Sequence, residues 1–321
     1  MRRLYILLLF LFPVFASAQF ASADLRDLDD SEVVTAMKEQ VAYLSSAMLE
    51  GRKAGSEGEK EAARYVSEVL SSYGIDLLSG EEGEIFGLRQ ENGDTLRSRN
   101  VIGFIPGYDP ELRDHYIVIG ARLDNLGTTE ITVNGEKRQT VYYGANGNAS
   151  GLAMLMQLAR KLKTNSVLLR RSVIIAAFGS SLEMGAGAWY FLNRSFAGAA
   201  DVDAMVNLDM LGTGSSGFYA YTSSNQDLNA IVTRLSGTLQ PLQPKLVSLE
   251  PVSSDHRAFY EKGIPSIFFT TGMYPEYNTD KDTASVLEYD DMERELEYIY
   301  NFTLELVNGA KPGFRVKDER G

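Results

Sequence analysis

The sequence predicts an α/β fold with three layers, in which helices flank a mostly parallel central sheet. Five short segments are apolar at nearly every position: Asn100–Pro106, His115–Ala121, Ser172–Phe178, Asp203–Leu211 and Ile264–Thr270. Strands that are apolar on both faces are typical of a sheet covered by helices on each side. Because helical segments alternate with these runs, an α/β sandwich is favoured over an all-β fold.

Two helices are predicted before the first strand, at Ser31–Leu49 and Glu57–Tyr73. In the second segment, apolar side chains recur at helical spacing and Gly74 follows as a stop signal. The polar segment Glu50–Gly58 between the helices is expected to form a turn. The order of elements therefore begins with helices and continues with alternating strands and helices.

The first 18 residues have the pattern of a signal peptide, with two arginines, an apolar run over 4–12 and Ala-Ser-Ala before Gln19. A membrane anchor is the alternative, but the apolar run is short for a bilayer and Pro13 interrupts it. We therefore expect an exported protein, periplasmic or extracellular, without a stable membrane anchor. One folded domain is expected over residues 19–313, followed by a charged tail over 314–321.

Composition excludes several classes of function. The formal net charge is −12, and no run of lysine and arginine interleaves with aromatic residues, so nucleic acid is not an expected partner. The chain has no cysteine, which excludes disulfides, thiolate metal sites and a lipid-modified cysteine after the leader.

Polar or glycine-rich segments follow the predicted strands at the end where α/β folds carry their sites. They are Arg122–Asp124, Gly179–Glu183, Asp209 and Thr271–Thr283, together with the loop Tyr143–Gly151. That loop, YGANGNASG, has no charged residue, and its one serine, Ser150, can cap the helix that follows. A function is therefore expected to depend on what these strand ends bring together.

Eight segments carry a resemblance to a known family. They are LEGRKAGSEG (49–58), NVIGFIPG (100–107), YIVIGA (116–121), GANGNASG (144–151), AAFG (176–179), VNLDMLG (206–212), SDHRAFYEKGIP (254–265) and YNTDKDT (277–283). In this order they resemble the two-zinc aminopeptidases, a family that also includes glutaminyl cyclases and the transferrin receptor ectodomain. The resemblance implies a zinc-aminopeptidase-like sandwich and, for an intact site, metal-dependent peptidase chemistry.

The resemblance also implies where the zinc ligands would lie, and four of the five positions differ. The family's first histidine is replaced by Arg122, and the acid that bridges both zincs is replaced by Gly147. A ligand glutamate corresponds to Leu182, and the histidine of Tyr-His-Thr corresponds to Asn278. Only the aspartate ligand, Asp209, is retained.

Two further positions concern catalysis and orientation. The family's general base is a glutamate, and the matching residue is Ser181, whereas the aspartate that orients the first histidine is retained as Asp124. A one-residue bulge would instead place Glu183 at a ligand position, but it would restore only one ligand. Neither His115, at the start of its strand, nor His256 restores a histidine pair.

We therefore predict that zinc, expected for the family, is absent here and that the protein is a non-catalytic member. The former cleft would bind a peptide or a protein partner. An active aminopeptidase with unconventional metal binding is the alternative, and metal-free chemistry at Asp124 or Asp209 is a third. Arg122 is expected to pair with Asp209 or Asp124 in place of the metal, the alternative being that it points into solvent.

Three other patterns carry less weight. Gly212–Gly217 matches a dinucleotide-binding fingerprint, but a strand is expected after it rather than a helix. Ser181 with Asp255 and His256 lacks the surrounding motif of a serine hydrolase. The side chains of Tyr274, Tyr277 and His256, with Glu276 and Trp189 nearby, are candidates to line a ligand pocket.

Overall fold

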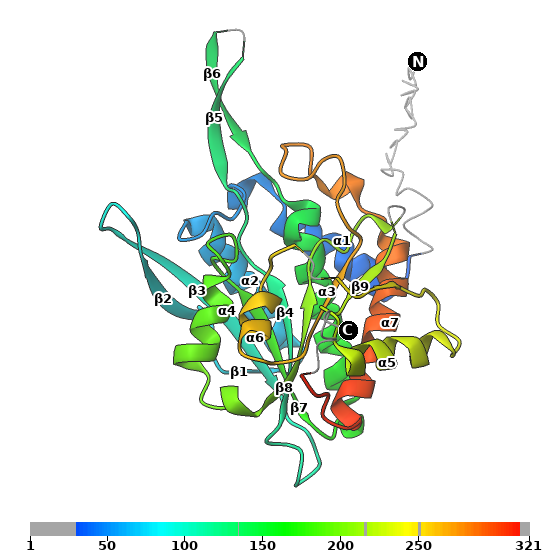
Figure 1. Ribbon diagram of the computed structural model, residues 1–321. Coiled ribbons are helices and arrows are strands. Elements are labelled where there is room, and N and C mark those ends of the chain that lie inside the picture. Colours follow the sequence, from blue (N-terminus) through cyan, green and yellow to red (C-terminus); the bar gives the residue numbers. More distant parts are fainter. Residues whose placement is uncertain (1–29, 134, 215–216, 250–251, 315–321) are drawn as a thin grey trace, which may run out of the picture.

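The computed structural model describes residues 30–133, 135–214, 217–249 and 252–314. A nine-stranded mixed sheet runs through the protein in the order β1-β3-β7-β4-β8-β11-β9-β10, with β2 paired to β3 (Figure 1). The strands are β1 (Asp76–Leu77), β2 (Glu84–Arg89), β3 (Thr95–Ile105), β4 (Tyr116–Arg122), β7 (Ser172–Phe178), β8 (Val202–Leu208), β9 (Tyr219–Tyr221), β10 (Lys245–Val247) and β11 (Ser266–Thr270). A separate two-stranded sheet consists of β5 (Thr128–Val133) and β6 (Glu136–Val141).

The helices are α1 (Glu32–Leu44), α2 (Glu57–Ser72), α3 (Ser150–Thr164), α4 (Ala186–Tyr190), α5 (Gln226–Ser236), α6 (His256–Glu261) and α7 (Tyr289–Asn308). Short 3₁₀ turns occur at Ala47–Leu49, Ser166–Leu168, Ala199–Asp201 and Ala284–Val286. No helix in the described part of the chain is long and apolar enough to cross a membrane.

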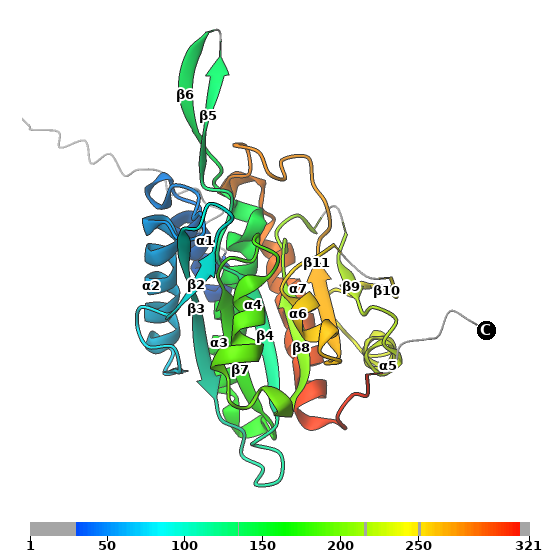
Figure 2. The same ribbon diagram turned by 60° about the vertical axis from the view of Figure 1, so that its left-hand side comes forward.

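The predicted three-layer sandwich is confirmed. In β7, Val173, Ile175 and Ala177 belong to the core under α1, α2, α3, α5 and α7, whereas Ile174, Ala176 and Phe178 belong to the core under α4 and α6. Since successive side chains of a strand point to opposite faces, a strand that is apolar throughout is buried on both sides. Figure 2 shows the strands of this sheet side by side, from β3 on the left to β9 and β10 on the right.

The central strands β7, β4, β8 and β11 are parallel, as predicted, and the outer strands are partly antiparallel. β3 runs antiparallel to β7, and β9 runs antiparallel to β11. The four central carboxyl ends therefore meet at one edge of the sheet, where the loops carrying the candidate site lie.

Element boundaries mostly match the predictions. Helix α2 begins after Ser56, whose hydroxyl accepts a hydrogen bond from the N–H of Glu59, and it ends before Gly74, whose φ of 74° favours glycine. The helix predicted for Ser31–Leu49 is broken at Ser45, so that α1 is followed by a separate 3₁₀ turn. The predicted leader at residues 1–18 and most of the predicted tail, from residue 315, lie outside the described residues.

Candidate functional site

Arg122, the last residue of β4, lies beside Asp209, which follows β8. Because β4 and β8 are adjacent parallel strands, their carboxyl ends bring the two side chains together on the face covered by α4 and α6. Nη2 of Arg122 donates a hydrogen bond of 3.1 Å to Oδ1 of Asp209. The predicted pairing of Arg122 with Asp209 is therefore confirmed, and the guanidinium does not point into solvent.

The environment of this ion pair keeps Arg122 charged. The side chains of Arg122 and Asp209 are only 5% and 8% exposed. Burial by itself lowers the pKa of Arg122, but the carboxylates of Asp209 and Asp124 outweigh burial and raise it above its ordinary value. The hydroxyl of Ser254 donates a second hydrogen bond, of 2.9 Å, to Asp209. Both oxygens of Asp209 are thus occupied by protein donors.

Asp124 does not share that hydrogen bond. Its carboxylate accepts hydrogen bonds from the backbone N–H groups of Ser181, at 2.7 Å, and Leu182, at 3.3 Å. Burial raises the pKa of Asp124, and the nearby Arg122 and these N–H groups oppose that effect. Asp124 therefore positions the loop after β7, while its charge still contributes to the field around Arg122.

The hydroxyl of Ser181 contacts Asp255 rather than His256. Its Oγ lies 2.8 and 2.9 Å from the two oxygens of Asp255 and 3.1 Å from the carbonyl oxygen of Phe178. The hydroxyl of Ser181 donates to this carboxyl, and burial raises the pKa of Asp255 well above its usual range. Ser181 is thus held as a structural hydroxyl, and within the described residues its hydroxyl makes no hydrogen bond to an imidazole.

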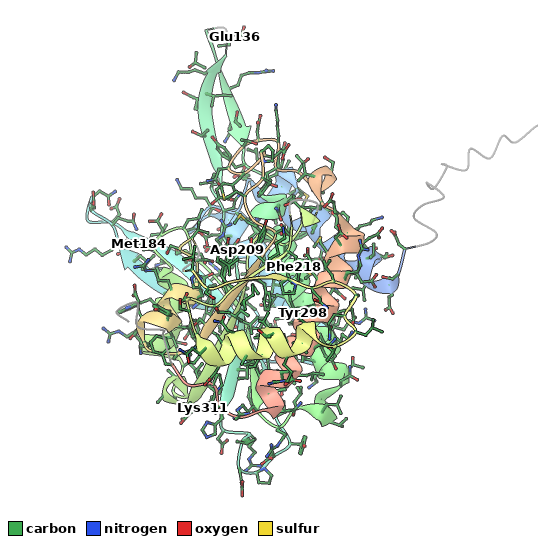
Figure 3. All side chains as sticks on the ribbon, turned by 45° about the vertical axis from the view of Figure 1, so that its right-hand side comes forward. Glu136, Met184, Asp209, Phe218, Tyr298 and Lys311 are labelled. Atoms are coloured by element: carbon green, nitrogen blue, oxygen red, sulfur yellow. The ribbon has the colours of Figure 1, made fainter. Side chains whose placement is uncertain are left out.

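His256 begins α6 and is buried against Phe268, with ring centroids 5.2 Å apart. Burial lowers its pKa to about 4, so the imidazole is neutral near pH 7. The other histidine, His115, lies at the start of β4, where its Nδ1 is 3.2 Å from Asp203. Lys311 pairs with the same aspartate, at the end of the sheet away from Asp209 (Figure 3).

The glycine-rich loop is closed by Asp282. This carboxylate accepts hydrogen bonds from the N–H groups of Asn146, at 2.8 Å, and Gly147, at 3.0 Å, and from the hydroxyl of Tyr274, at 2.8 Å. A Cβ added at Gly147 would lie 3.3 Å from both Asp282 and Tyr274 and 3.6 Å from Nη2 of Arg122. The space beside Gly147 is therefore filled by these three side chains.

The remaining ligand positions lie outside the buried cluster. Leu182 is 41% exposed. Asn278 is also exposed and has a left-handed backbone with φ of 57°. Glu183, considered as a replacement ligand, is exposed as well. Of the five expected ligand positions, only three thus lie together in the interior: Arg122, Gly147 and Asp209.

The predicted pocket residues divide into two groups. Tyr274 and Tyr277 pack edge to face, with centroids 5.8 Å apart, next to Asp282. His256 instead contacts Phe268, which lines a small cleft of about 70 Å³. That cleft is bounded by Met210, Tyr221, Val252, Phe268, Thr270, Gly272 and Met273.

Several residues that form this site could not be predicted from the sequence. Asp282 and Ser254 lie in segments that carry the family resemblance, but nothing in the segments indicates their partners. Arg52 is fully buried and donates hydrogen bonds to the carbonyl oxygens of Leu44, Leu123, Tyr143 and Gly144. An arginine between a glycine and a lysine in the turn Glu50–Gly58 gave no sign of burial.

A zinc ion does not fit the donor set of this site. Zinc in proteins takes nitrogen, sulfur or carboxylate ligands, at least three of them in an open catalytic site. Arginine keeps its proton, glycine and leucine have no side-chain donor, and Asp209 already accepts from Arg122 and Ser254. Within the described ranges, no group of three or more His, Cys, Asp or Glu residues is arranged to hold a metal ion.

Comparison with known proteins identifies the fold and the family. The Escherichia coli (strain K12) protein YfbL, described as uncharacterized, is 25% identical over 291 residues, which cover 80% of this chain and 83% of that protein. BSAP, a zinc aminopeptidase from Bacillus subtilis, superposes with a TM-score of 0.65 at 16% identity, covering 88% and 98% of the two chains. Porphyromonas gingivalis glutaminyl cyclase superposes with a TM-score of 0.65 at 18% identity, covering 86% and 97%.

These structural likenesses establish the fold, since their sequence identity is low. The family itself is identified from the sequence, because residues 100–303 match Peptidase family M28. This range contains Arg122, Gly147, Ser181, Leu182, Asp209 and Asn278. The chain belongs to Peptidase family M28.

Proposed function

We propose that this protein is an exported, non-catalytic member of the family, which binds a peptide or protein ligand at the former active-site cleft. The observation that carries the proposal is the buried hydrogen bond between Arg122 and Asp209. A permanent cation occupies the position of a zinc-binding histidine, and it neutralises the one retained ligand. The guanidinium would also repel a divalent cation at the same place.

The loss of chemistry follows from the loss of ligands. Metal-dependent hydrolysis uses a metal-bound water of lowered pKa and a base that takes its proton. The base position is Ser181, whose hydroxyl is held by Asp255 and Phe178. The described site therefore provides neither the ligands for a metal that would bind this water nor a base that would take its proton.

The cleft beside the site favours an apolar side chain as ligand. It has a volume of about 70 Å³ and is lined mainly by Met210, Tyr221, Val252, Phe268 and Met273. On the loop after β7, Leu182 is 41% exposed and Met184, labelled in Figure 3, is 98% exposed. Exposed apolar side chains are typical of a surface that binds peptide or protein, and an apolar cleft is typical of a ligand site.

The proposal of export is based on the sequence of residues 1–18 alone, and no contact of the folded domain contributes to it. The prediction is that the mature chain begins near Gln19 and is recovered from the periplasm or the medium. Mass spectrometry of the N-terminus of the native protein tests it. Retention of residues 1–18 in a membrane fraction would favour the anchor instead.

An active aminopeptidase with unconventional metal binding is the competing function, and membership of a peptidase family favours it. The decisive experiment incubates the mature, untagged protein with zinc, desalts it and measures both metal content and hydrolysis of a leucine anilide. A non-catalytic protein should retain less than about a tenth of a zinc per chain and show no turnover. Stoichiometric zinc with turnover would support the active enzyme.

A fivefold revertant tests the assignment of positions. Arg122→His, Gly147→Asp, Ser181→Glu, Leu182→Glu and Asn278→His would restore the ligand types and the base of the family. The folded revertant is expected to bind zinc, whereas a variant that restores only the last three should not, because Arg122 still holds Asp209. A folded revertant without zinc affinity would contradict the assignment.

A further inference from the structure

Strands β5 and β6 form a ribbon that projects well beyond the rest of the molecule (Figures 1 and 2). Their residues pair from Thr128 with Val141 to Val133 with Glu136. Figure 3 shows Glu136 at the far end of this ribbon. Within the described residues, neither strand pairs with any strand other than its neighbour. Each strand therefore presents an open edge of backbone N–H and C=O groups.

Hydrogen bonds fix the base of the ribbon next to the candidate site. The N–H of Tyr142 donates to the carbonyl of Gly127 at 2.9 Å, and the N–H of Gly127 donates to Gly51 at 2.9 Å. The side chain of Asn125 also donates to the carbonyl of Tyr142. These contacts fix the start of the ribbon, but a two-stranded sheet in water is itself marginally stable and gains from further strands.

The two open edges differ in composition. β5 reads TTEITV, in which five of six residues are β-branched and Glu130 is the single charge. β6 reads EKRQTV and begins with three charged residues. Charged residues, lysine above all, are the usual protection of an edge strand against pairing, whereas β-branched residues favour it. The open edge of β5 is thus the one suited to accept another strand.

The charges of the ribbon allow a second copy of this chain to be the partner. The ribbon is neutral, with Glu130 and Glu136 against Lys137 and Arg138, and Nζ of Lys137 lies 2.6 Å from Glu130. The whole chain carries a formal net charge of −12, so contact between two bodies would be repulsive. Six strand residues span about 20 Å, against a Debye length of about 8 Å at physiological salt. Two copies joined by their ribbons would therefore keep their acidic bodies apart.

We propose that β5 pairs antiparallel with β5 of a second copy about a two-fold axis, giving a four-stranded sheet with the two β6 strands at its outer edges. Such an interface is closed, because both copies contribute the same edge. Six-residue strands bury little area, so the dimer is weak and reversible and depends on protein concentration. This inference is independent of the proposed function of the cleft.

Disulfide trapping tests the pairing, and the absence of native cysteine makes it clean. Ile131 in β5 and Arg138 in β6 lie directly opposite each other in the ribbon. The proposed register places Ile131 opposite Ile131 of the second copy, so that in Ile131→Cys the two thiols meet across the interface, whereas in Arg138→Cys they are separated by both β5 strands. Oxidation, or a short bis-maleimide, should link Ile131→Cys into dimers at least about tenfold faster than Arg138→Cys. Equal rates, or faster linkage through β6, would overturn the proposal.

Removal of the ribbon provides a second test. Because Gly127 and Tyr142 are hydrogen-bonded at its base, residues 128–141 can be replaced by two glycines without separating the flanking backbone. Sedimentation velocity over a range of concentrations should give a monomer–dimer equilibrium for the full chain and a monomer for the deletion. Circular dichroism confirms that the deletion is folded. A full chain that is monomeric at every concentration, or a deletion that still dimerises, would refute β5 pairing.

Discussion

Nη2 of Arg122 lies 3.1 Å from Oδ1 of Asp209, and each side chain is less than a tenth exposed. Asp124 is fully buried nearby, and its charge also raises the pKa of Arg122. A single guanidinium thus compensates two acids at the edge of the sheet.

Removal of either partner of this ion pair should destabilise the fold strongly. Arg122→Met leaves Asp209 without its charged partner, and Asp209→Leu leaves the guanidinium among the other carboxylates. Each is expected to lower the free energy of unfolding by about 3–5 kcal/mol. Denaturation in urea, monitored by circular dichroism, measures the change.

The double variant Arg122→Met/Asp209→Leu is the matched control for that prediction. With both charges removed, less free energy should be lost than the sum of the two single losses. Arg64→Met, which removes an exposed partner of Glu61 and Glu68, should change stability little. Additive losses in the double variant would mean that the pair is not coupled.

Two substitutions at Gly147 should distinguish the effect of side-chain size on stability from the effect of charge. Gly147→Ala places a methyl group in tight contact with Asp282 and Tyr274, at 3.3 Å, without forcing a positive φ. Its cost should be about 1 kcal/mol. Gly147→Asp adds a carboxylate beside that of Asp282 and should cost at least about 2 kcal/mol more.

The comparison of the two Gly147 variants by urea denaturation is the measurement. The carboxylate is expected to become tolerable only when Arg122→His and the other reversions bring in a metal. If Gly147→Asp alone were as stable as Gly147→Ala, the space beside Gly147 would still accept an acid, and the closed arrangement around Asp282 would be wrong.

Glu295, on α7, should make stability depend on pH. It is fully buried, and both of its carboxyl oxygens lack a hydrogen-bond partner among the described residues. Burial raises its pKa well above the usual range, and the nearby Asp291 and Glu288 raise it further. The folded protein therefore keeps a proton that the unfolded chain releases above about pH 4.3.

The direction of this pH dependence follows from the number of protons that the folded and unfolded states bind. Stability is greatest below the unfolded pKa and falls as pH rises toward the folded pKa, because the unfolded state binds fewer protons. Glu295→Leu should stabilise the fold, and its advantage should grow between pH 5 and pH 8 by up to about 1.4 kcal/mol per pH unit. Urea denaturation at both pH values tests this. An advantage of equal size at both would show that Glu295 is not protonated in the fold.

Chelation should not affect stability. A structural metal raises the melting temperature through its binding free energy, and its removal lowers it. With Arg122 compensating Asp209, excess EDTA should shift the melting temperature by less than about 1 °C. Differential scanning calorimetry of the native protein, with and without EDTA, makes the comparison. A clear decrease on chelation would contradict the absence of a resident metal.

Most of the fold could be predicted from the pattern of apolar residues in the sequence. Ser172–Phe178 was predicted with the bounds that the structure has, because a run buried on both faces is distinctive. The predicted strand Asp203–Leu211 instead ends at Leu208, since the chain turns there to present Asp209 to Arg122. The direction of the outer strands could not be predicted, because the antiparallel pairing of β3 with β7 leaves no trace in a run of apolar residues.

The sequence by itself determined which family the chain resembles and which ligand types are missing, because ligands are a matter of residue identity at matched positions. It also predicted that Arg122 would find a carboxylate. The tertiary structure decided which one: Asp209 accepts the guanidinium, whereas Asp124 is turned to the N–H groups of Ser181 and Leu182. It likewise decided that Asp282 and Tyr274 fill the space beside Gly147. Gly147 and Asp282 are 135 residues apart in the sequence. Contacts of this kind depend on which parallel strands are neighbours, which no local pattern encodes.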